Sequence, residues 1–214
     1  GFKDNLKSLG FVNLTPIQEK SVDILLEGKD CIAKANTGSG KTLAFSIPLV
    51  ESLDVKKFKI QTLILAPTRE LANQIATNLR DYIRHTHNVK VLTLCGGMPF
   101  KPQAASLFHG AHIIVGTAGR ILKHIKEENI DLSNVKNLVL DEADKMLDMG
   151  FYDDILEIIN VLPKQRQSML FSATYEDNIE SLASSILTNP SFVEIASQRA
   201  RIKQTFYKCE KQNR

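Results

Sequence analysis

The chain has 214 residues, of which 43% are hydrophobic and 24% are charged, and its formal net charge at pH 7 is +3. This length and composition predict a soluble globular protein with one substantial core, and exclude a membrane-spanning protein, because no apolar run approaches the roughly 20 residues that a spanning helix needs. Three cysteines and five histidines without disulfide or metal-site spacing, and a start that lacks the zones of a secretory signal, predict an intracellular, cytoplasmic protein.

Short apolar runs alternate with longer amphipathic stretches along the chain. The predicted strands span residues 31–34, 62–66, 89–94, 111–115, 137–140, 168–171 and 192–195. The predicted helices between them include residues 41–53, 70–84, 120–127, 152–161 and 176–187. Continuous apolar runs indicate strands that are covered on both faces, so the repeated strand-helix-strand unit predicts an α/β fold with a mostly parallel sheet flanked by helices on both sides.

The first motif along the chain is Thr15-Pro16-Ile17-Gln18, at the start of a helical stretch. A capping box, with Thr15 as the N-cap and Gln18 as the third helical residue, explains it in structural terms. The functional alternative is that the Gln18 amide reads the N6 and N7 edge of adenine, because it offers one donor and one acceptor side. Different atoms of Gln18 can serve the two roles, so both stay open.

A glycine-rich loop follows the strand at 31–34, and a helix follows the loop. The loop reads Ala35-Asn36-Thr37-Gly38-Ser39-Gly40-Lys41-Thr42. Strand, loop and helix in this order are typical of a phosphate-binding loop, whose backbone N–H groups and helix N-terminus face the phosphates. We expect Lys41 to neutralise the β- and γ-phosphates and Thr42 to offer its hydroxyl to magnesium. The alternative is a plain Gly-Ser turn that begins a helix.

The strands at 62–66 and 111–115 are followed by a shared construction. Its two copies read Thr68-Arg69-Glu70 and Thr117-Ala118-Gly119-Arg120. In each, a threonine is placed to cap the next helix, and an arginine in the first turn opposes the helix dipole. A bound anion would offset that unfavourable charge, whereas the alternative is that both arginines form ordinary surface ion pairs.

Two acidic residues follow the strand at 137–140, in the run Asp141-Glu142-Ala143-Asp144. Ligands of open α/β sheets bind at the carboxyl ends of the strands. We expect Asp141 to hold magnesium through water and Glu142 to deprotonate the water that attacks the γ-phosphate. The alternative is an acidic helix N-terminus. Further on, Ser172-Ala173-Thr174 follows the strand at 168–171, and the pattern by itself favours a helix cap.

Together these motifs resemble the first RecA-like domain of DEAD-box RNA helicases, in family order and over nearly the whole chain. The resemblance is carried by Gln18, the loop 35–42, Pro67-Thr68-Arg69-Glu70-Leu71-Ala72, Gly96-Gly97, Thr117-Ala118-Gly119-Arg120, Asp141 to Asp144 and Ser172-Ala173-Thr174. The sequence departs from the family at Leu14 and Ala118, where many members have proline, and the family's adenine-stacking aromatic would precede Gly1.

The resemblance implies that ATP and Mg²⁺ are the cofactors and that RNA, held by its sugar-phosphate backbone, is the partner. It implies catalytic roles for Lys41, Asp141, Glu142, Ser172 and Thr174, with Ser172 and Thr174 hydrogen-bonded to the acidic motif. The implied nucleotide-binding residues are Phe11, Gln18, Ala35, Asn36, Thr37, Gly38, Ser39, Gly40, Lys41, Thr42 and Asp144, and the magnesium residues are Thr42 and Asp141. The implied RNA-binding residues are Pro67, Thr68, Arg69, Gly96, Gly97, Thr117, Gly119 and Arg120.

Within the family, the run 94–100 most resembles the bacterial DbpA-like subgroup, which acts on ribosomal RNA. Residues 1–195 are expected to form the RecA-like domain. Residues 196–214, with a strand-like run at 202–207, are expected to be a linker and the start of a second such domain. Since family members complete the ATP site with arginines of that second domain, we expect a monomeric fragment that binds ATP or ADP, hydrolyses at most a trace and does not unwind RNA.

Two other functions compete with this interpretation. One is a different phosphate-loop NTPase, but a guanine reader normally carries Asn-Lys-x-Asp, and the sequence has no such run. The other is a non-catalytic RNA-binding or scaffold module that keeps the nucleotide fold. A module that had lost ATP turnover would be free to lose its catalytic residues, whereas this sequence keeps Lys41, Thr42, Asp141 and Glu142.

Overall fold

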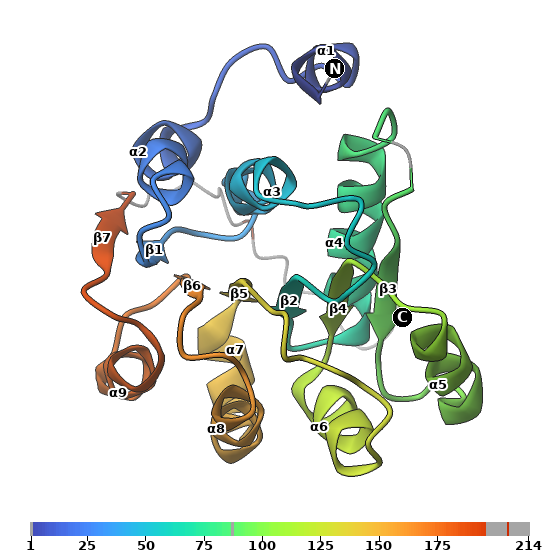
Figure 1. Ribbon diagram of the computed structural model, residues 1–214. Coiled ribbons are helices and arrows are strands. Elements are labelled where there is room, and N and C mark those ends of the chain that lie inside the picture. The colour runs from blue at the N-terminus through green and yellow to red at the C-terminus, as the bar shows by residue number, and fades with distance from the viewer. Residues whose placement is uncertain (1, 87, 196–204, 206–214) are drawn as a thin grey trace, which may run out of the picture.

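The computed structural model describes residues 2–86, 88–195 and 205, and in these residues strands and helices alternate along the chain (Figure 1). The strands are β1 (Cys31–Lys34), β2 (Thr62–Leu65), β3 (Val91–Leu94), β4 (Ile113–Gly116), β5 (Asn137–Leu140), β6 (Gln167–Ser172) and β7 (Ser191–Glu194). They form a sheet in the order β3-β4-β2-β5-β6-β1-β7, and every neighbouring pair is parallel. The prediction of a parallel α/β sheet is therefore confirmed.

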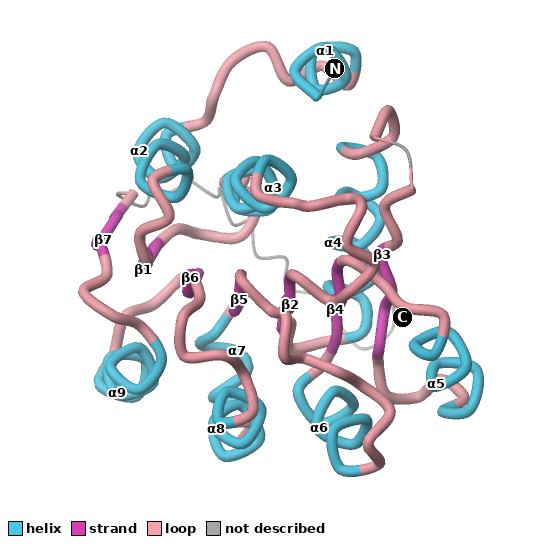
Figure 2. Tube along the Cα trace, in the orientation of Figure 1, coloured by secondary structure: helices cyan, strands magenta, loops and turns pink. Residues whose placement is uncertain are grey.

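Helices cover both faces of this sheet (Figure 2). One face carries α2 (Pro16–Leu26), α3 (Lys41–Glu51) and α4 (Arg69–Tyr82), with α1 (Phe2–Ser8) beyond them at the outside of the layer. The other face carries α5 (Phe100–Phe108), α6 (Ala118–Lys126), α7 (Ala143–Asp148), α8 (Tyr152–Asn160) and α9 (Asp177–Ile186). Within the described part of the chain, no helix has the length and apolar character needed to cross a membrane.

Alternating side chains of the strands build one hydrophobic core on each face. In β2, Leu63 and Leu65 belong to the core beneath α5–α9, whereas Ile64 belongs to the core beneath α2–α4. In β5, Leu138 and Val139 divide between the two cores in the same way. These side chains are all fully buried, and burying such a side chain stabilises the fold by about 1.5 to 3 kcal/mol. Burial on both faces explains why the strands read as continuous apolar runs.

Most predicted elements lie within two residues of the observed bounds. The strands at 31–34 and 137–140 match β1 and β5 in full. The helices α1, α5 and α7 were not predicted, because they are short and offer little periodicity, whereas the nine-residue helices α6 and α8 each carry a regular apolar face. The predicted linker at 196–214 and the strand-like run at 202–207 lie outside the described residues, apart from residue 205.

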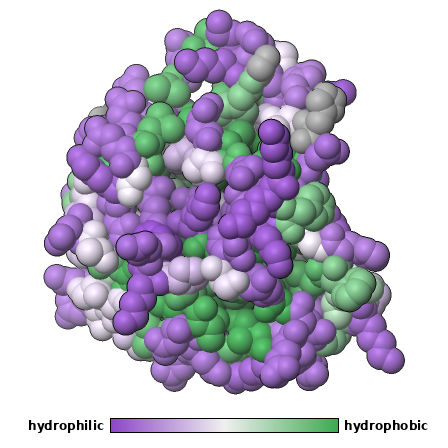
Figure 3. All heavy atoms as spheres, viewed as in Figure 1, coloured by the Kyte–Doolittle hydropathy of each residue, from purple (hydrophilic) through white to green (hydrophobic). Residues whose placement is uncertain are grey.

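Because all the strands are parallel, their carboxyl ends share one edge of the sheet, and the loops that follow them meet there. This edge collects the motifs that follow β1, β2, β3, β4, β5 and β6. In the view of Figure 3 the surface is mostly hydrophilic, and hydrophobic atoms gather below the sheet, on the side of α5–α9.

Candidate functional site

A cleft of about 370 Å³ opens at the carboxyl ends of β1 and β5, on the side of α2–α4. Among its lining residues are nine predicted site residues: Phe11, Gln18, Thr37, Gly38, Gly40, Lys41, Thr42, Asp141 and Glu142. The loop and the acidic motif thus meet in one cavity although about a hundred residues separate them. Of the predicted nucleotide-binding residues, Ala35, Asn36, Ser39 and Asp144 do not line the cleft.

The loop between β1 and α3 has the geometry of a phosphate cradle. Gly38 and Gly40 have φ angles of 81° and 96°, in the left-handed region where residues with a side chain are strained. At Gly40 a Cβ would also lie 2.6 Å from Gln18 Nε2, so only glycine fits between the loop and α2. The start of the loop is fixed to β6, because the Ala35 N–H donates to the Ser172 carbonyl over 2.9 Å.

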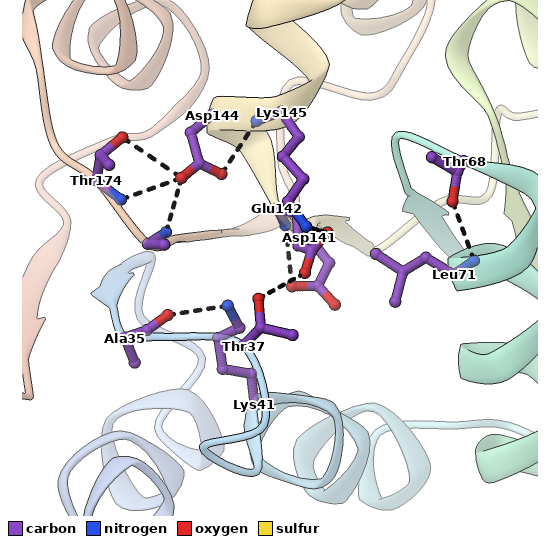
Figure 4. A network of polar contacts seen from close by, with 11 residues as sticks. Ala35, Thr37, Lys41, Thr68, Leu71, Asp141, Glu142, Asp144, Lys145 and Thr174 are labelled. Carbon is purple, nitrogen blue, oxygen red and sulfur yellow. Dashed lines mark hydrogen bonds and ion pairs between the residues drawn. The ribbon is translucent and has the colours of Figure 1, made fainter. Parts of the chain in front are cut away.

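Lys41 is the first residue of α3 and is buried at the floor of the cleft. Its Nζ donates to the Ala35 carbonyl over 2.9 Å, so the ammonium is held against the inside of the loop (Figure 4). Thr42 follows it at the first turn of the same helix and also lines the cleft. A buried cation at a helix N-terminus makes an anion site.

Gln18 joins α2 to the loop through both ends of its amide. Its Oε1 accepts from the Thr15 N–H over 2.9 Å, which confirms its predicted part in a capping box. Its Nε2 donates to the Gly40 carbonyl over 3.0 Å. These bonds use one acceptor and one donor site of an amide that has two of each. Gln18 is buried, with 2% of its surface exposed, but it lines the cleft, so adenine recognition by the second pair stays a prediction.

The acidic motif closes the other side of the cleft (Figure 4). Glu142 Oε1 accepts from the Thr37 hydroxyl over 2.9 Å, and Glu142 Oε2 accepts from Lys145 Nζ over 2.8 Å. Thr37 therefore links the loop directly to the acidic residue at the end of β5. Glu142 itself has a φ of 52°, a left-handed conformation that costs a non-glycine residue about 1 to 3 kcal/mol and that clusters at functional sites.

Asp141 is buried, with 3% of its surface exposed, and burial raises the pKa of its carboxyl to about 6. The nearby Lys41 ammonium counteracts this rise in pKa, whereas the Glu142 carboxylate adds to it. Asp141 Oδ1 also accepts from the Glu142 N–H over 3.0 Å. A carboxylate desolvated in this way gains from any cation that enters the cleft.

We expect Asp141→Asn to make the metal-free protein more stable at pH 7.5 by about 2 to 3 kcal/mol, since a pKa difference of one unit corresponds to 1.36 kcal/mol. The folded-state pKa of about 6 exceeds the unfolded value of about 3.9. Between these values the folded state binds more protons, so the stability of the parent falls as pH rises from about 4 to about 6. The amide does not ionise and escapes this loss.

Urea unfolding in the presence of a chelator, at pH 4 and at pH 7.5, measures this difference. The gain of Asp141→Asn should shrink toward zero near pH 4, and the exposed control Asp153→Asn should change stability little at either pH. A variant that is less stable than the parent at pH 7.5 would mean that the Asp141 carboxylate supports the fold.

Asp144 faces away from the cleft toward the residues that follow β6. Its Oδ2 accepts from the Ala173 N–H and the Thr174 N–H, each over 3.1 Å, and from the Thr174 hydroxyl over 3.4 Å. The predicted bond from Ser172 is wrong: its buried hydroxyl has no hydrogen-bond partner among the described residues. Ser172 is the last residue of β6, so the strand fixes its side-chain direction, whereas the next two residues are free to turn toward Asp144.

The predicted RNA-binding residues follow β2, β3 and β4, which are neighbours at one side of the sheet. Thr68 caps α4 as predicted, because its hydroxyl accepts from the Leu71 N–H over 3.2 Å. Arg69 is exposed and forms an ion pair with Glu70 over 3.1 Å, and its guanidinium would lie 3.4 Å from a Cβ at Gly97. Two loops therefore meet at Arg69. Pro67 is buried, so its side chain does not reach this surface.

Arg120 is held by the loop and helix that follow β3. Its guanidinium donates to Gln103 Oε1 over 3.1 Å and to the Met98 carbonyl over 2.9 Å, and it lies 5.5 Å from the centre of the Phe100 ring. No ion pair of Arg120 occurs within the described residues, so the ion-pair alternative is wrong for this arginine. The prediction that Thr117 caps α6 is also wrong, because its side chain accepts no such bond.

Sequence reasoning missed several residues that the structure places at these sites. Leu71, Gln74, Asn78 and Tyr82 line the cleft from one face of α4. Their spacing of three and four residues predicts that they share one face of a helix. It does not predict that this face borders the cleft. Lys145 was missed because its pairing with Glu142 depends on the turn into α7.

Gln103 was missed as well. It connects three elements, since its Oε1 also contacts His124 Nε2 over 3.1 Å and its Nε2 donates to the Cys95 carbonyl over 3.1 Å. The helix that carries Gln103 is short and was not predicted from periodicity. The sequence therefore gives no sign that this glutamine joins three elements.

The cleft fits a magnesium ion by the chemistry of its donors. Thr42 and Asp141 offer a hydroxyl and a carboxylate, and Mg²⁺ binds few protein oxygens while keeping waters and substrate phosphates. Nowhere in residues 2–86 and 88–195 do three His, Cys, Asp or Glu side chains converge as a metal site of their own. An ion in this cleft would therefore take its remaining contacts from waters and a phosphate ligand.

Comparison with known proteins adds an independent finding. A family model described as DEAD/DEAH box helicase matches residues 15–182. The chain is 46% identical over 205 residues to the ATP-dependent RNA helicase DbpA of Escherichia coli (strain K12), covering 95% of this chain and 45% of that protein. It is 42% identical over 213 residues to the ATP-dependent RNA helicase CshA of Listeria monocytogenes, covering 98% of this chain and 41% of that protein. The chain thus spans less than half the length of these relatives.

Solved structures share the fold. A DEAD box protein from the hyperthermophile Methanococcus jannaschii superposes with a TM-score of 0.85 at 40% identity, over 89% of this chain and 52% of that one. A hypothetical ATP-dependent RNA helicase from Sulfolobus tokodaii superposes with a TM-score of 0.82 at 36% identity, over 91% of this chain and 56% of that one. These similarities confirm the predicted fold class.

Proposed function

Because this chain belongs to the DEAD/DEAH box helicase family, we propose that it is the ATP-binding part of an RNA helicase that couples ATP binding and hydrolysis to the remodelling of RNA duplexes. The observation that carries the proposal is the single cleft shared by the glycine-rich loop and the acidic motif. The bond between Thr37 and Glu142 joins the two motifs across that cleft.

Each residue has a role that its position supports. Backbone amides of the loop and the Lys41 ammonium bind the phosphates, while Thr42 and Asp141 would hold Mg²⁺, which would offset phosphate charge. Glu142 orients and deprotonates the attacking water. Gln18 recognises adenine with the donor and acceptor sites that its two structural bonds leave open.

The contact between Asp144 and Thr174 ties the acidic motif to the segment after β6. We propose that this contact couples the nucleotide state of the cleft to RNA binding. A shift of the acidic motif on nucleotide binding would pull directly on that segment, because three hydrogen bonds from two residues end on one carboxylate oxygen.

RNA lies along the loops that follow β2, β3 and β4. Arg69, Arg120 and the exposed glycines at 96 and 97 supply cations and close backbone approach there. The Gln103 and Met98 contacts fix the direction of the Arg120 guanidinium before RNA arrives. Contacts of this kind hold the sugar-phosphate backbone and select little sequence, so the ribosomal RNA preference of a DbpA-like protein would depend on other parts of the protein.

We expect Arg120→Ala or Arg69→Ala, placed in the longer protein, to weaken single-stranded RNA binding and to reduce the slope of log K against log salt by about 0.7 for each phosphate that the variant no longer neutralises. Fluorescence anisotropy at several salt concentrations measures the slope. Arg84→Ala, at an exposed position after α4, is the matched control. An unchanged slope in the Arg120 and Arg69 variants would remove both residues from the interface.

Residues 1–195 form the ATP-binding domain in this proposal, and 196–214 lead into a second RecA-like domain. That domain supplies arginines that stabilise the transition state, and such an arginine is worth about 10³ to 10⁵ in rate. The chain by itself therefore binds nucleotide as a monomer, turns over at most a trace of ATP and does not unwind RNA. We place the protein in the cytoplasm.

Nucleotide competition on the purified chain tests the function. We expect ATP and ADP with magnesium to displace a fluorescent adenine nucleotide, GTP to compete poorly, and added RNA to leave ATP turnover at trace level. Equal competition by GTP would favour a different phosphate-loop NTPase. Strong RNA-stimulated turnover by this chain would overturn the dependence on a second domain, and no nucleotide binding at all would favour a scaffold module.

A further inference from the structure

The N-terminal helix α1 is attached to the end of α4 by one buried side chain. Asn5, which is 2% exposed, donates from Nδ2 to the Asp81 carbonyl over 2.8 Å and to the Tyr82 carbonyl over 2.6 Å. The last carbonyls of a helix have no partners within the helix, so this amide satisfies them from outside. Seventy-six positions of sequence separate Asn5 from Asp81, and the bond therefore fixes a tertiary contact.

The segment after α1 folds back on the helix and ends at the cleft. The Phe11 N–H donates to the Leu6 carbonyl over 3.0 Å, and the Gly10 N–H donates to the Lys7 carbonyl over 3.0 Å. The position of α1 therefore sets the position of Phe11. The Phe11 ring meets the Tyr82 ring edge to face, with 5.7 Å between the ring centres, and both residues line the cleft.

This aromatic pair borders the same cleft as the phosphate loop and Gln18. The cleft follows α4 from Leu71 to Tyr82, and eleven residues of α-helix rise about 16 Å at 1.5 Å per residue. The phosphates belong beside Lys41, so a base recognised by Gln18 has the aromatic pair as an apolar wall of the same cleft. Phe11 keeps 39% of its surface exposed, which gives an incoming ring an apolar face.

We propose that Asn5 is a positioning residue for nucleotide binding: by tethering α1 to the end of α4, it holds Phe11 against Tyr82 and so builds the wall that receives the base and ribose. This inference rests on the proposed ATP-binding function and adds to it a residue that never touches the ligand. The tether acts on the base end alone, because the phosphate loop is held by its own contacts with Gln18 and β6.

The test compares ATP with inorganic tripolyphosphate, which has the phosphates but no base or ribose. Dissociation constants of both are measured with magnesium on the parent chain, on Asn5→Ala and on Asn5→Asp, which keeps the size of the side chain but loses the N–H donors. We expect the dissociation constant of ATP to rise about tenfold, the effect of losing about 1.4 kcal/mol, and that of tripolyphosphate to stay unchanged.

Ser8→Ala is the matched control, because the Ser8 hydroxyl donates only to the Asn5 carbonyl of the same helix, over 2.7 Å. It should leave both constants as in the parent. Thermal unfolding checks that the Asn5 variants are folded; if they are not, Phe11→Ala, which changes a half-exposed ring, should give the same selective loss of ATP affinity.

Four outcomes would overturn the inference. Equal weakening of ATP and tripolyphosphate would mean that Asn5 supports the whole domain, and unchanged ATP affinity in folded Asn5 variants would mean that the tether does not shape the cleft. If the parent binds tripolyphosphate but shows no preference for ATP, the aromatic end receives no base. If the parent binds neither ligand, the proposed ATP-binding function fails, and the positioning role fails with it.

Discussion

Replacing Lys41 with alanine is expected to weaken the binding of ATP with magnesium by about 100-fold or more, which corresponds to about 2.7 kcal/mol. The ammonium is buried beneath the loop and bonded to the Ala35 carbonyl, so the protein has already desolvated and oriented it before the nucleotide arrives. Removing one partner of a buried charged contact costs about 2 to 5 kcal/mol. Isothermal titration calorimetry of the purified chain measures the loss.

The control for this experiment is Lys20→Ala, which removes the same charge from an exposed position on α2. It should bind ATP as the parent does, because Lys20 is exposed and, among the described residues, donates to the Glu194 carbonyl at the surface. Thermal unfolding of both variants separates loss of binding from loss of fold. A folded Lys41→Ala protein with unchanged affinity for ATP would contradict the assignment of the loop as a phosphate site.

In the longer protein, Glu142→Gln is expected to lower RNA-stimulated ATP turnover by about 10² to 10⁴, the usual contribution of a general base. The amide keeps the size of the side chain and an oxygen that can accept from the Thr37 hydroxyl, but it has no lone pair basic enough to take the proton of water. The affinity for ATP should stay within about threefold of the parent, which is less than 1 kcal/mol.

Glu157→Gln is the matched control, because Glu157 is also a glutamate paired with a lysine, Lys126, over 3.1 Å, but on the surface of α8. Steady-state turnover and equilibrium nucleotide binding are measured on the same preparations. If Glu142→Gln lost ATP binding as well as turnover, Glu142 would support the cleft through its bonds to Thr37 and Lys145. If turnover survived, another group would be the base.

The fold was predictable because a strand that is buried on both faces of the sheet has a continuous apolar run in its sequence. The runs that became β1 and β5 were apolar for most of their length, and the longer helices carried a regular apolar face. Three short helices escaped prediction, of which α7 has only six residues. Elements of that length are held by packing against the core, and their own sequence carries too few turns to show a period.

The site was predictable where a motif is local. Gly40, Lys41 and Thr42 are contiguous, and their chemistry follows from a strand, a tight turn and a helix N-terminus. Predictions about single side chains held less well: Thr68 caps its helix but Thr117 does not, and Thr174 contacts Asp144 but Ser172 does not. A side chain's direction depends on where its strand ends, and one residue of difference reverses it.

By itself the sequence determined the alternation of strands and helices, the loop that begins α3, and the pairing of Asp141 with Glu142 at a strand end. Only the tertiary structure decided that Thr37 bonds Glu142 across 105 positions, that Asn5 ties α1 to α4, and that Gln103 and Met98 fix Arg120. Contacts within a few residues follow from backbone geometry, which the local sequence encodes. Contacts between distant segments arise when a shared sheet edge brings their loops together, and strand order, which no local pattern contains, sets which loops meet.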